Sequence, residues 1–202
     1  MSNKRPNHSE PKILTIQFDG PHPAYSETKD ILADCKHRKT GGVYFWAIKV
    51  NDSFRITHIG QTSTSFYQRM KEHIINTLGG NYRISDSDAL GRGEVKSLWE
   101  GLWREGHRER LPEFLRDSTK LLEAAKRNLK MEKIFVAPLD TEDRMRRRIE
   151  GAIAKQIRKD KVASSLFPPD IRVLGRLTTE APIPIRIVTS VKILGLPEQL
   201  DV

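Results

Sequence analysis

Two neighbouring segments rich in aromatic and β-branched residues most constrain how this chain can fold. Residues Val43 to Val50 read Val-Tyr-Phe-Trp-Ala-Ile-Lys-Val, and Phe54 to Ile59 have the same character after the turn-like sequence Asn51-Asp52-Ser53. Such residues favour strands, and a short polar turn between two strands is typical of a β-hairpin. We therefore expect a β-hairpin at the centre of the fold.

The hydrophobic period changes directly after this hairpin. Apolar residues recur every four positions from Phe66 to Leu78, which predicts an amphipathic helix. Ser63 or Thr64 can cap the start of this helix, and the Gly79-Gly80 pair ends it. The order of elements is thus a hairpin followed by a helix.

A third strand and a second long helix complete the predicted core. Lys133 to Leu139 has strand character, and Asp140 or Thr141 then caps a helix that runs to about Lys161. The intervening residues, from Asn81 to Lys130, have mostly helical patterns and form an insertion. We predict the α+β class: a small three-stranded antiparallel sheet flanked by helices, with a helical insertion and a C-terminal extended segment.

The predicted boundaries follow from these elements. They give an N-terminal extension at residues 1–40, a core at 41–161 with the helical insertion at about 81–130, and a C-terminal extension at 162–202. In the first extension, Ile13 to Phe18 predicts a strand and Ser26 to His37 a short helix. In the second, the alternating segment Ile185 to Val191 predicts extended structure packed on the core.

Composition narrows the classes of partner. The chain has 202 residues and a formal net charge of +9, which favours polyanions, because neutralised phosphates release condensed counterions. Its single cysteine, Cys35, cannot form an intrachain disulfide, which fits a reducing cytoplasm. No apolar stretch is long enough for a signal peptide or a membrane span. We expect a soluble cytoplasmic protein that does not bind membranes.

Two short motifs in the hairpin carry a family resemblance. Gly42-Val43-Tyr44 in the first strand and His58-Ile59-Gly60 in the second are similar to the motifs that name the GIY-YIG nucleases. Gln61-Thr62-Ser63 follows the second motif as in many members, Arg69 and His73 lie on the next helix, and Glu150 lies on the helix after the third strand. The resemblance spans about Gly41 to Lys161 and is interrupted by the insertion.

This resemblance implies a fold and a reaction. It implies that a DNA phosphodiester is hydrolysed with one divalent cation, Mg²⁺ or Mn²⁺, held by Glu150, and that Tyr44 is the general base or passes on the proton of the attacking water. A base role requires a phenol pKa well below the usual value of about 10. Taken alone, Tyr44 belongs to three consecutive aromatic residues that pack a strand; with the other elements in order, catalysis is the better interpretation.

The residues on the first helix have two interpretations. Arg69 and His73 are four positions apart and therefore share one helix face. Arg69 suits a forked contact to the scissile phosphate, and His73 suits orienting a tyrosine or contacting the same phosphate. The alternative is that both residues lie on a solvated helix face. For His73 this alternative and a functional role are about equally plausible, and for Arg69 the functional role is favoured.

Glu150 also has an ordinary interpretation. Arg146 precedes it by four residues, so the two could form a surface ion pair worth only a few tenths of a kcal/mol. The position of Glu150 one helix after the third strand favours a metal ligand, because one carboxylate together with phosphate and water suits Mg²⁺.

Two departures from the family pattern bear on activity. His58 stands where tyrosine is usual, and a histidine can still donate a hydrogen bond or shuttle a proton. No asparagine follows Asn128, so the late asparagine of many members is absent, and Asp170 is a candidate replacement. The set of candidate site residues is Tyr44, His58, Arg69, His73 and Glu150.

Basic clusters are candidates for contacts to the DNA backbone. They lie at Arg104 to Arg110, Lys126 to Lys130, Arg144 to Arg148 and Arg158 to Lys161. For any one cluster a solubilising helix face is the simpler interpretation, and only convergence near Tyr44 and Glu150 favours DNA binding. We expect Trp99 and Trp103 in a core.

Two functions remain as alternatives. The first is a metal-dependent DNA endonuclease, which needs a homodimer or two binding events to cut both strands with one site per chain. The second is a catalytically impaired DNA-binding module on the same scaffold. A small-molecule enzyme finds no support, because no glycine-rich phosphate loop or Rossmann motif is present.

Overall fold

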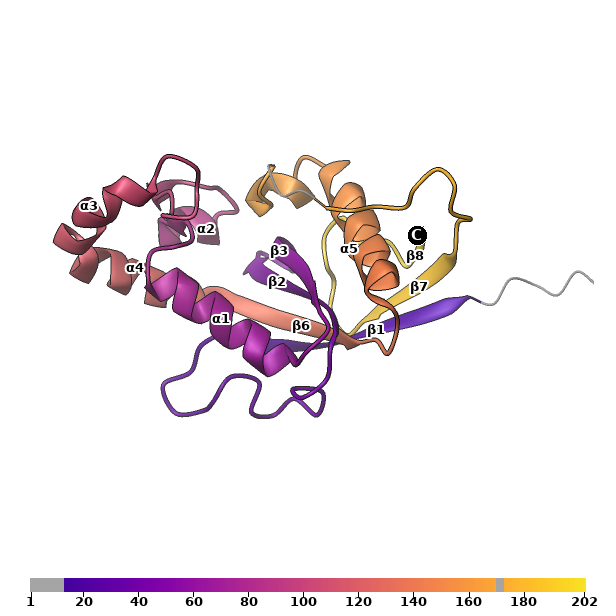
Figure 1. The fold of residues 1–202 in the computed structure, drawn as a ribbon. Helices are drawn as coiled ribbons and strands as arrows, with labels where there is room; N and C mark the ends of the chain where they lie inside the picture. Colours follow the sequence, from indigo (N-terminus) through magenta and orange to yellow (C-terminus); the bar gives the residue numbers. More distant parts are fainter. Residues whose placement is uncertain (1–12, 170–172) are drawn as a thin grey trace, which may run out of the picture.

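A computed structural model describes residues 13–169 and 173–202 (Figure 1). The strands are β1 (Leu14–Pro23), β2 (Gly42–Val50), β3 (Ser53–Thr62), β4 (Ile84–Ser85), β5 (Ser97–Trp99), β6 (Glu132–Pro138), β7 (Pro184–Thr189) and β8 (Gln199–Asp201). The helices are α1 (Phe66–Leu78), α2 (Ser87–Gly91), α3 (Leu111–Arg116), α4 (Ser118–Met131) and α5 (Asp143–Arg158), with 3₁₀ turns η1 (Arg108–Arg110) and η2 (Ala163–Leu166).

The central sheet is larger than the sequence predicted. It has six strands in the order β3-β2-β6-β1-β7-β8, and β1 and β7 run parallel while the other neighbours are antiparallel. The prediction of a small three-stranded antiparallel sheet is therefore wrong. The segments on both sides of residues 41–161 add β1, β7 and β8 to the antiparallel strands β3, β2 and β6.

The hairpin and the α1 helix form as predicted. β2 and β3 pair from Gly42 with Thr62 to Val50 with Ser53, with one irregularity after Trp46. Helix α1 ends at Gly79, but its cap is Ser65, whose hydroxyl accepts a hydrogen bond from the backbone N–H of Gln68. The predicted helix at 26–37 is wrong, because residues 24–41 form turns and bends.

Alternation along β2 divides the core between two helices. Val43, Phe45 and Ala47 point into one hydrophobic cluster, which includes Ile149 and Ile153 of α5. Tyr44 and Trp46 point to the opposite face, into a cluster that includes Phe66 and Met70 of α1. The sheet thus has α5 on one face and α1 on the other.

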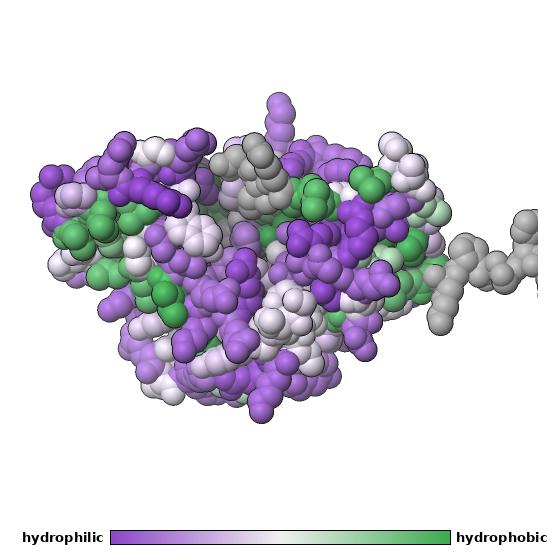
Figure 2. Space-filling view, viewed as in Figure 1, coloured by the Kyte–Doolittle hydropathy of each residue, from purple (hydrophilic) through white to green (hydrophobic). Residues whose placement is uncertain are grey.

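The insertion packs around a small core of its own. That core joins Ile84, Trp99 and Leu102 to Phe114 and residues of α4. The region is only partly helical, since Ser97–Trp99 pairs with Ile84–Ser85 as a two-stranded sheet. Figure 2 shows mostly hydrophilic residues on the visible face, with hydrophobic ones gathered over this region at the left.

Substitution of Phe135 tests how much the main core contributes to stability. Its ring is completely buried and lies 4.6 Å from the Phe45 ring centroid and 5.5 Å from that of Phe54. We expect Phe135→Ala to lower the free energy of unfolding by about 3–5 kcal/mol, because it leaves a cavity. Urea denaturation measures this loss. Leu115→Ala, at a side chain that is 60% exposed, is the control, and a similar loss there would contradict the assignment.

Candidate active site

The hairpin brings Tyr44 to the centre of the candidate site. Tyr44 on β2 lies opposite Gly60 on β3, the strand at the end of the sheet. The Tyr44 ring passes so close to Gly60 that a Cβ there would lie 2.4 Å from the tyrosine hydroxyl oxygen. The glycine of the His-Ile-Gly sequence is thus required by the position of the tyrosine.

Two side chains of α1 hold the Tyr44 hydroxyl. Arg69 donates a hydrogen bond from Nε to this oxygen at 3.0 Å, and the oxygen lies 2.8 Å from Nε2 of His73. An arginine only donates, so the Tyr44 oxygen accepts from Arg69, and the phenol donates to His73 Nε2 in the neutral tautomer that carries its proton on Nδ1. Burial lowers the pKa of His73 to about 2, with His58 and Arg69 acting in the same direction, so the imidazole is neutral.

The pKa of Tyr44 shifts in the direction opposite to the expected one. Tyr44 is completely buried, and burial raises its pKa to about 12, although the charge of Arg69 acts to lower it. Glu150 acts electrostatically in the same direction as burial. Tyr44 is therefore a neutral phenol at physiological pH.

His58 lies beside this hydrogen-bonded group. Its ring centroid is 4.8 Å from that of His73 and 6.0 Å from that of Tyr44. Its Nε2 atom is buried and has no hydrogen-bond partner among the described residues. Burial, assisted by the charge of Arg69, lowers the pKa of His58 to about 4, so it too is neutral.

Glu150 lies on the helix that covers the other face of the sheet. It lies on α5, and its charge interacts with those of Tyr44 and Arg69. Within the described parts of the chain its carboxylate has no hydrogen bond or ion pair. Burial raises its pKa to about 7, against the charges of Arg147 and Arg69.

The ordinary interpretation of Glu150 as a surface ion pair does not hold. Arg146 instead contacts Gln61, the backbone oxygen of Thr141 and, at 3.7 Å, Asp143. Glu150 is thus a half-buried carboxylate that has no direct ion pair among the described residues, although the charges of Arg147 and Arg69 act on it, and such a group fits Mg²⁺ or Mn²⁺ with water and phosphate as the other ligands.

Four of the five predicted site residues therefore form one contact group: Tyr44, His58, Arg69 and His73. Glu150 joins them through charge. Asp170, the candidate replacement for the late asparagine, lies outside the described residues.

A cavity of about 530 Å³ begins at this group and extends to the insertion. His58, Arg69 and His73 line it from the sheet side, and Trp103 lines it from the insertion. The other polar lining residues are Thr57, Thr77, Asn81, Tyr82, Arg83, Ser85, Glu100, Arg104, Asn128 and Glu132. Trp99 is buried as expected, but Trp103 is 64% exposed, so its predicted place in a core is wrong.

Sequence patterns did not reveal the contribution of Glu132. It begins β6, directly after α4, and Thr57 donates a hydrogen bond to its carboxyl at 3.2 Å. Burial raises its pKa to about 7. Acidic residues at strand ends are common, so only the fold shows that this one lines the cavity.

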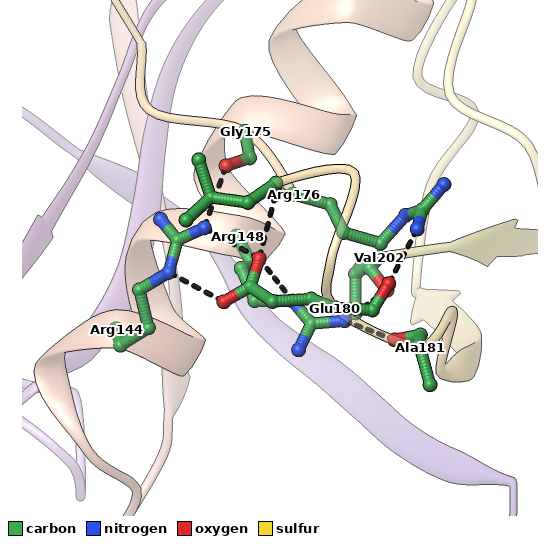
Figure 3. Close-up of polar contacts among 8 residues, drawn as sticks. Arg144, Arg148, Gly175, Arg176, Glu180, Ala181 and Val202 are labelled. Atoms are coloured by element: carbon green, nitrogen blue, oxygen red, sulfur yellow. Dashed lines mark hydrogen bonds and ion pairs between the residues drawn. The ribbon is translucent and has the colours of Figure 1, made fainter.

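The predicted basic cluster at Arg144 to Arg148 is mainly structural. Arg144 forms a forked pair with Glu180, and Arg148 donates to the backbone oxygens of Ala181 and Val202 (Figure 3). Hydrogen bonds from Arg144 and from the backbone N–H of Leu177 lower the pKa of Glu180 to about 2. These arginines attach the C-terminal segment to α5 and are not free for phosphate.

In the other basic clusters, too, several residues form ion pairs within the chain. Lys130 pairs with Glu27 at 2.7 Å, and Arg110 pairs with Glu113 at 2.7 Å. Arg104 lines the cavity while pairing with Glu100 at 3.0 Å, and Arg83 lines it with no ion pair among the described residues. The positive charge that faces the cavity thus comes from Arg69, Arg83 and Arg104.

Comparison with protein-family models, with curated proteins and with solved structures finds no match. In the described residues, no helix is both long and apolar enough to cross a membrane. The geometry of the chain itself therefore carries the functional argument.

The contact between Tyr44 and Gly60 gives the first test of the site. We expect Gly60→Ala to lower the free energy of unfolding by about 1–3 kcal/mol, because the added methyl group displaces the tyrosine ring. In a Tyr44→Phe background the nearest clash is absent, so the same change should cost less. A double-mutant cycle by urea denaturation measures the coupling, and equal costs in both backgrounds would contradict it.

Glu132 gives a pH-dependent test. Between about pH 4.5 and 7 the folded chain holds a proton on Glu132 that the unfolded chain has released, so stability falls as the pH rises through this window. Glu132→Gln is neutral throughout and keeps the oxygen that Thr57 contacts. We expect its stability relative to the native chain to increase by about 2–3 kcal/mol between pH 4 and pH 8.

The measurement is urea denaturation of both proteins at several pH values. Glu123→Gln, at an exposed position on α4, is the matched control. An equal gain in the control, or a constant difference between native chain and Glu132→Gln, contradicts the expectation.

Proposed function

We propose that this chain is a metal-dependent DNA endonuclease that hydrolyses a phosphodiester at the Tyr44 site. One observation carries the proposal: the Tyr44 hydroxyl is held between Arg69 and His73, and Glu150, a carboxylate with no direct ion pair among the described residues, lies within electrostatic reach of Tyr44 and Arg69. The resemblance to GIY-YIG nucleases motivates the same roles for these residues. The net charge of +9 supports a polyanionic substrate.

Arg69 binds the scissile phosphate in this proposal. Its Nε contacts Tyr44 and its Nη1 contacts Glu72 at 2.9 Å, while Nη2 has no partner among the described residues. The side chain is 37% exposed, so a phosphate oxygen can reach it. A guanidinium held in this way stabilises negative charge as it develops on the phosphoryl oxygens.

Tyr44 passes on a proton and does not become a stable phenolate in this proposal. The attacking water forms the new bond to phosphorus and gives its proton to the Tyr44 oxygen, while the phenol proton moves to His73 Nε2. The bond to the leaving oxygen breaks, and that oxygen takes a proton from solvent. The bound phosphate places negative charge near Arg69 and so offsets one cause of the low His73 pKa.

Glu150 is the residue that holds the divalent cation. The cation, when bound, supplies charge that stabilises the leaving oxygen. His58 would keep the pocket beside His73 closed to bulk water and present a buried ring nitrogen to the cavity.

The complete burial of Tyr44 favours a second function, a DNA-binding module without catalysis. Water must reach the phenol past His58, Arg69 and His73, which line the cavity while Tyr44 does not. In this second function Arg69, Arg83 and Arg104 bind phosphates and the Tyr44 group only supports α1. We place either function in the cytoplasm, with homodimers where both DNA strands are cut.

Nicking of supercoiled plasmid in Mg²⁺ or Mn²⁺ tests the proposal. We expect the native chain to nick, and Glu150→Gln and Tyr44→Phe to lower the rate by at least about 100-fold, since each removes a group that acts on the reacting atoms. Glu123→Gln is the matched control and should retain the native rate.

Binding to the same DNA, measured by fluorescence anisotropy at several salt concentrations, separates the two functions. Salt-sensitive binding by all four proteins with nicking by none supports the DNA-binding module. Nicking that persists in Glu150→Gln at the native rate overturns the assignment of the site.

A further inference from the structure

Three side chains of different chemistry meet at the far end of β1. β1 has an irregular register between Asp19 and His22, and this brings both side chains towards Cys35, which lies in the turns of residues 24–41. One carboxylate oxygen, one imidazole nitrogen and the thiol sulfur all lie within 4.8 Å of one another. This group is separate from the Tyr44 site and from its cavity.

The distances match those between ligands of one tetrahedral metal ion. Oδ2 of Asp19 lies 3.4 Å from Nε2 of His22 and 3.6 Å from Sγ of Cys35. Around zinc, the usual bond lengths place an oxygen and a nitrogen about 3.3 Å apart, and an oxygen and a sulfur about 3.5 Å apart. Both distances from Asp19 therefore suit one shared ion, and the His22 nitrogen and the Cys35 sulfur lie within 4.8 Å of each other.

The surroundings of the three atoms favour a bound cation. The Nε2 atom of His22 is buried and has no hydrogen-bond partner among the described residues. Cys35 is 3% exposed, and its thiol has the Asp19 carboxylate as its neighbour. A buried ring nitrogen that has no hydrogen bond lies beside a carboxylate and a thiol, and a metal ion satisfies all three groups.

We propose that Asp19, His22 and Cys35 bind one Zn²⁺ ion. Thiolate and imidazole favour zinc over Mg²⁺, which prefers oxygen ligands. A thiolate and a carboxylate balance the two positive charges. The fourth position goes to water, because Asp34, the other nearby carboxylate, is paired with Lys29 at 2.7 Å.

The ion joins an irregular segment to the sheet and, through that segment, supports α1. Residues 24–41 contain no helix or strand, yet the backbone oxygens of Arg38 and Thr40 accept hydrogen bonds at 2.9 Å from Tyr67 and Phe66 at the start of α1. Zinc binding at Cys35 therefore reduces motion in the segment that holds the first turn of α1, the helix of Arg69 and His73.

Titration of the native, metal-free protein with Co²⁺ and then Zn²⁺ tests this site. Cys35 is the only cysteine in the chain, so a thiolate-to-cobalt charge-transfer band identifies the ligand without mutation. We expect the band to saturate at one equivalent of Co²⁺ and to disappear on addition of Zn²⁺ but not of Mg²⁺. Absence of the band overturns the proposal, whatever the variants do.

Isothermal titration calorimetry with Zn²⁺ then compares variants. We expect Cys35→Ser and His22→Gln each to weaken binding by at least about 100-fold, because each removes a direct ligand. His37→Gln, at a histidine two residues from Cys35 that is outside the group, is the matched control and should bind as the native chain does. Equal affinity in all four proteins overturns the assignment to these residues.

Discussion

The packing of Tyr44 over Gly60 is the constraint on which the candidate site depends. Because β3 has no side chain at residue 60, the tyrosine ring can extend over the strand at the end of the sheet, and its hydroxyl reaches Arg69 and His73. The same arrangement brings the phenol within electrostatic reach of Glu150, although α1 and α5 lie on opposite faces. The hairpin register therefore determines which side chains of two separate helices can act together.

Local patterns predicted the elements near this contact but not the whole sheet. Alternating and four-residue periods are properties of neighbouring residues, and they gave β2, β3, α1, β6 and α5. The strand character of Ile13 to Phe18 and Ile185 to Val191 was also recognised, but their parallel pairing joins residues that are more than 160 positions apart, for example Ile16 with Ile187. Periodicity does not specify such a partner, so the sheet was predicted too small.

The candidate site shows the same division between local and distant information. Spacing on α1 put Arg69 and His73 on one face, and the structure joins both to Tyr44. The role of Glu132 was missed, and Trp103 was wrongly placed in a core. The surroundings of both residues arise only when the insertion packs against the sheet. The cluster of Asp19, His22 and Cys35 depends on an irregular register in β1, which no spacing rule predicts.

Two arginines of α5 attach the C-terminal segment to this helix, and this bears on the surroundings of Glu150. Arg144 and Arg148 fix Glu180 and the backbone of the last residues against α5, so the helix that carries Glu150 is fastened at positions six and two residues before it (Figure 3). Burial of the Glu150 carboxylate on this helix raises its pKa to about 7. Glu150 has no direct ion pair among the described residues, although the chain has 35 lysine and arginine residues and the charges of Arg147 and Arg69 act on it, and this is the property on which its proposed role as a metal ligand rests.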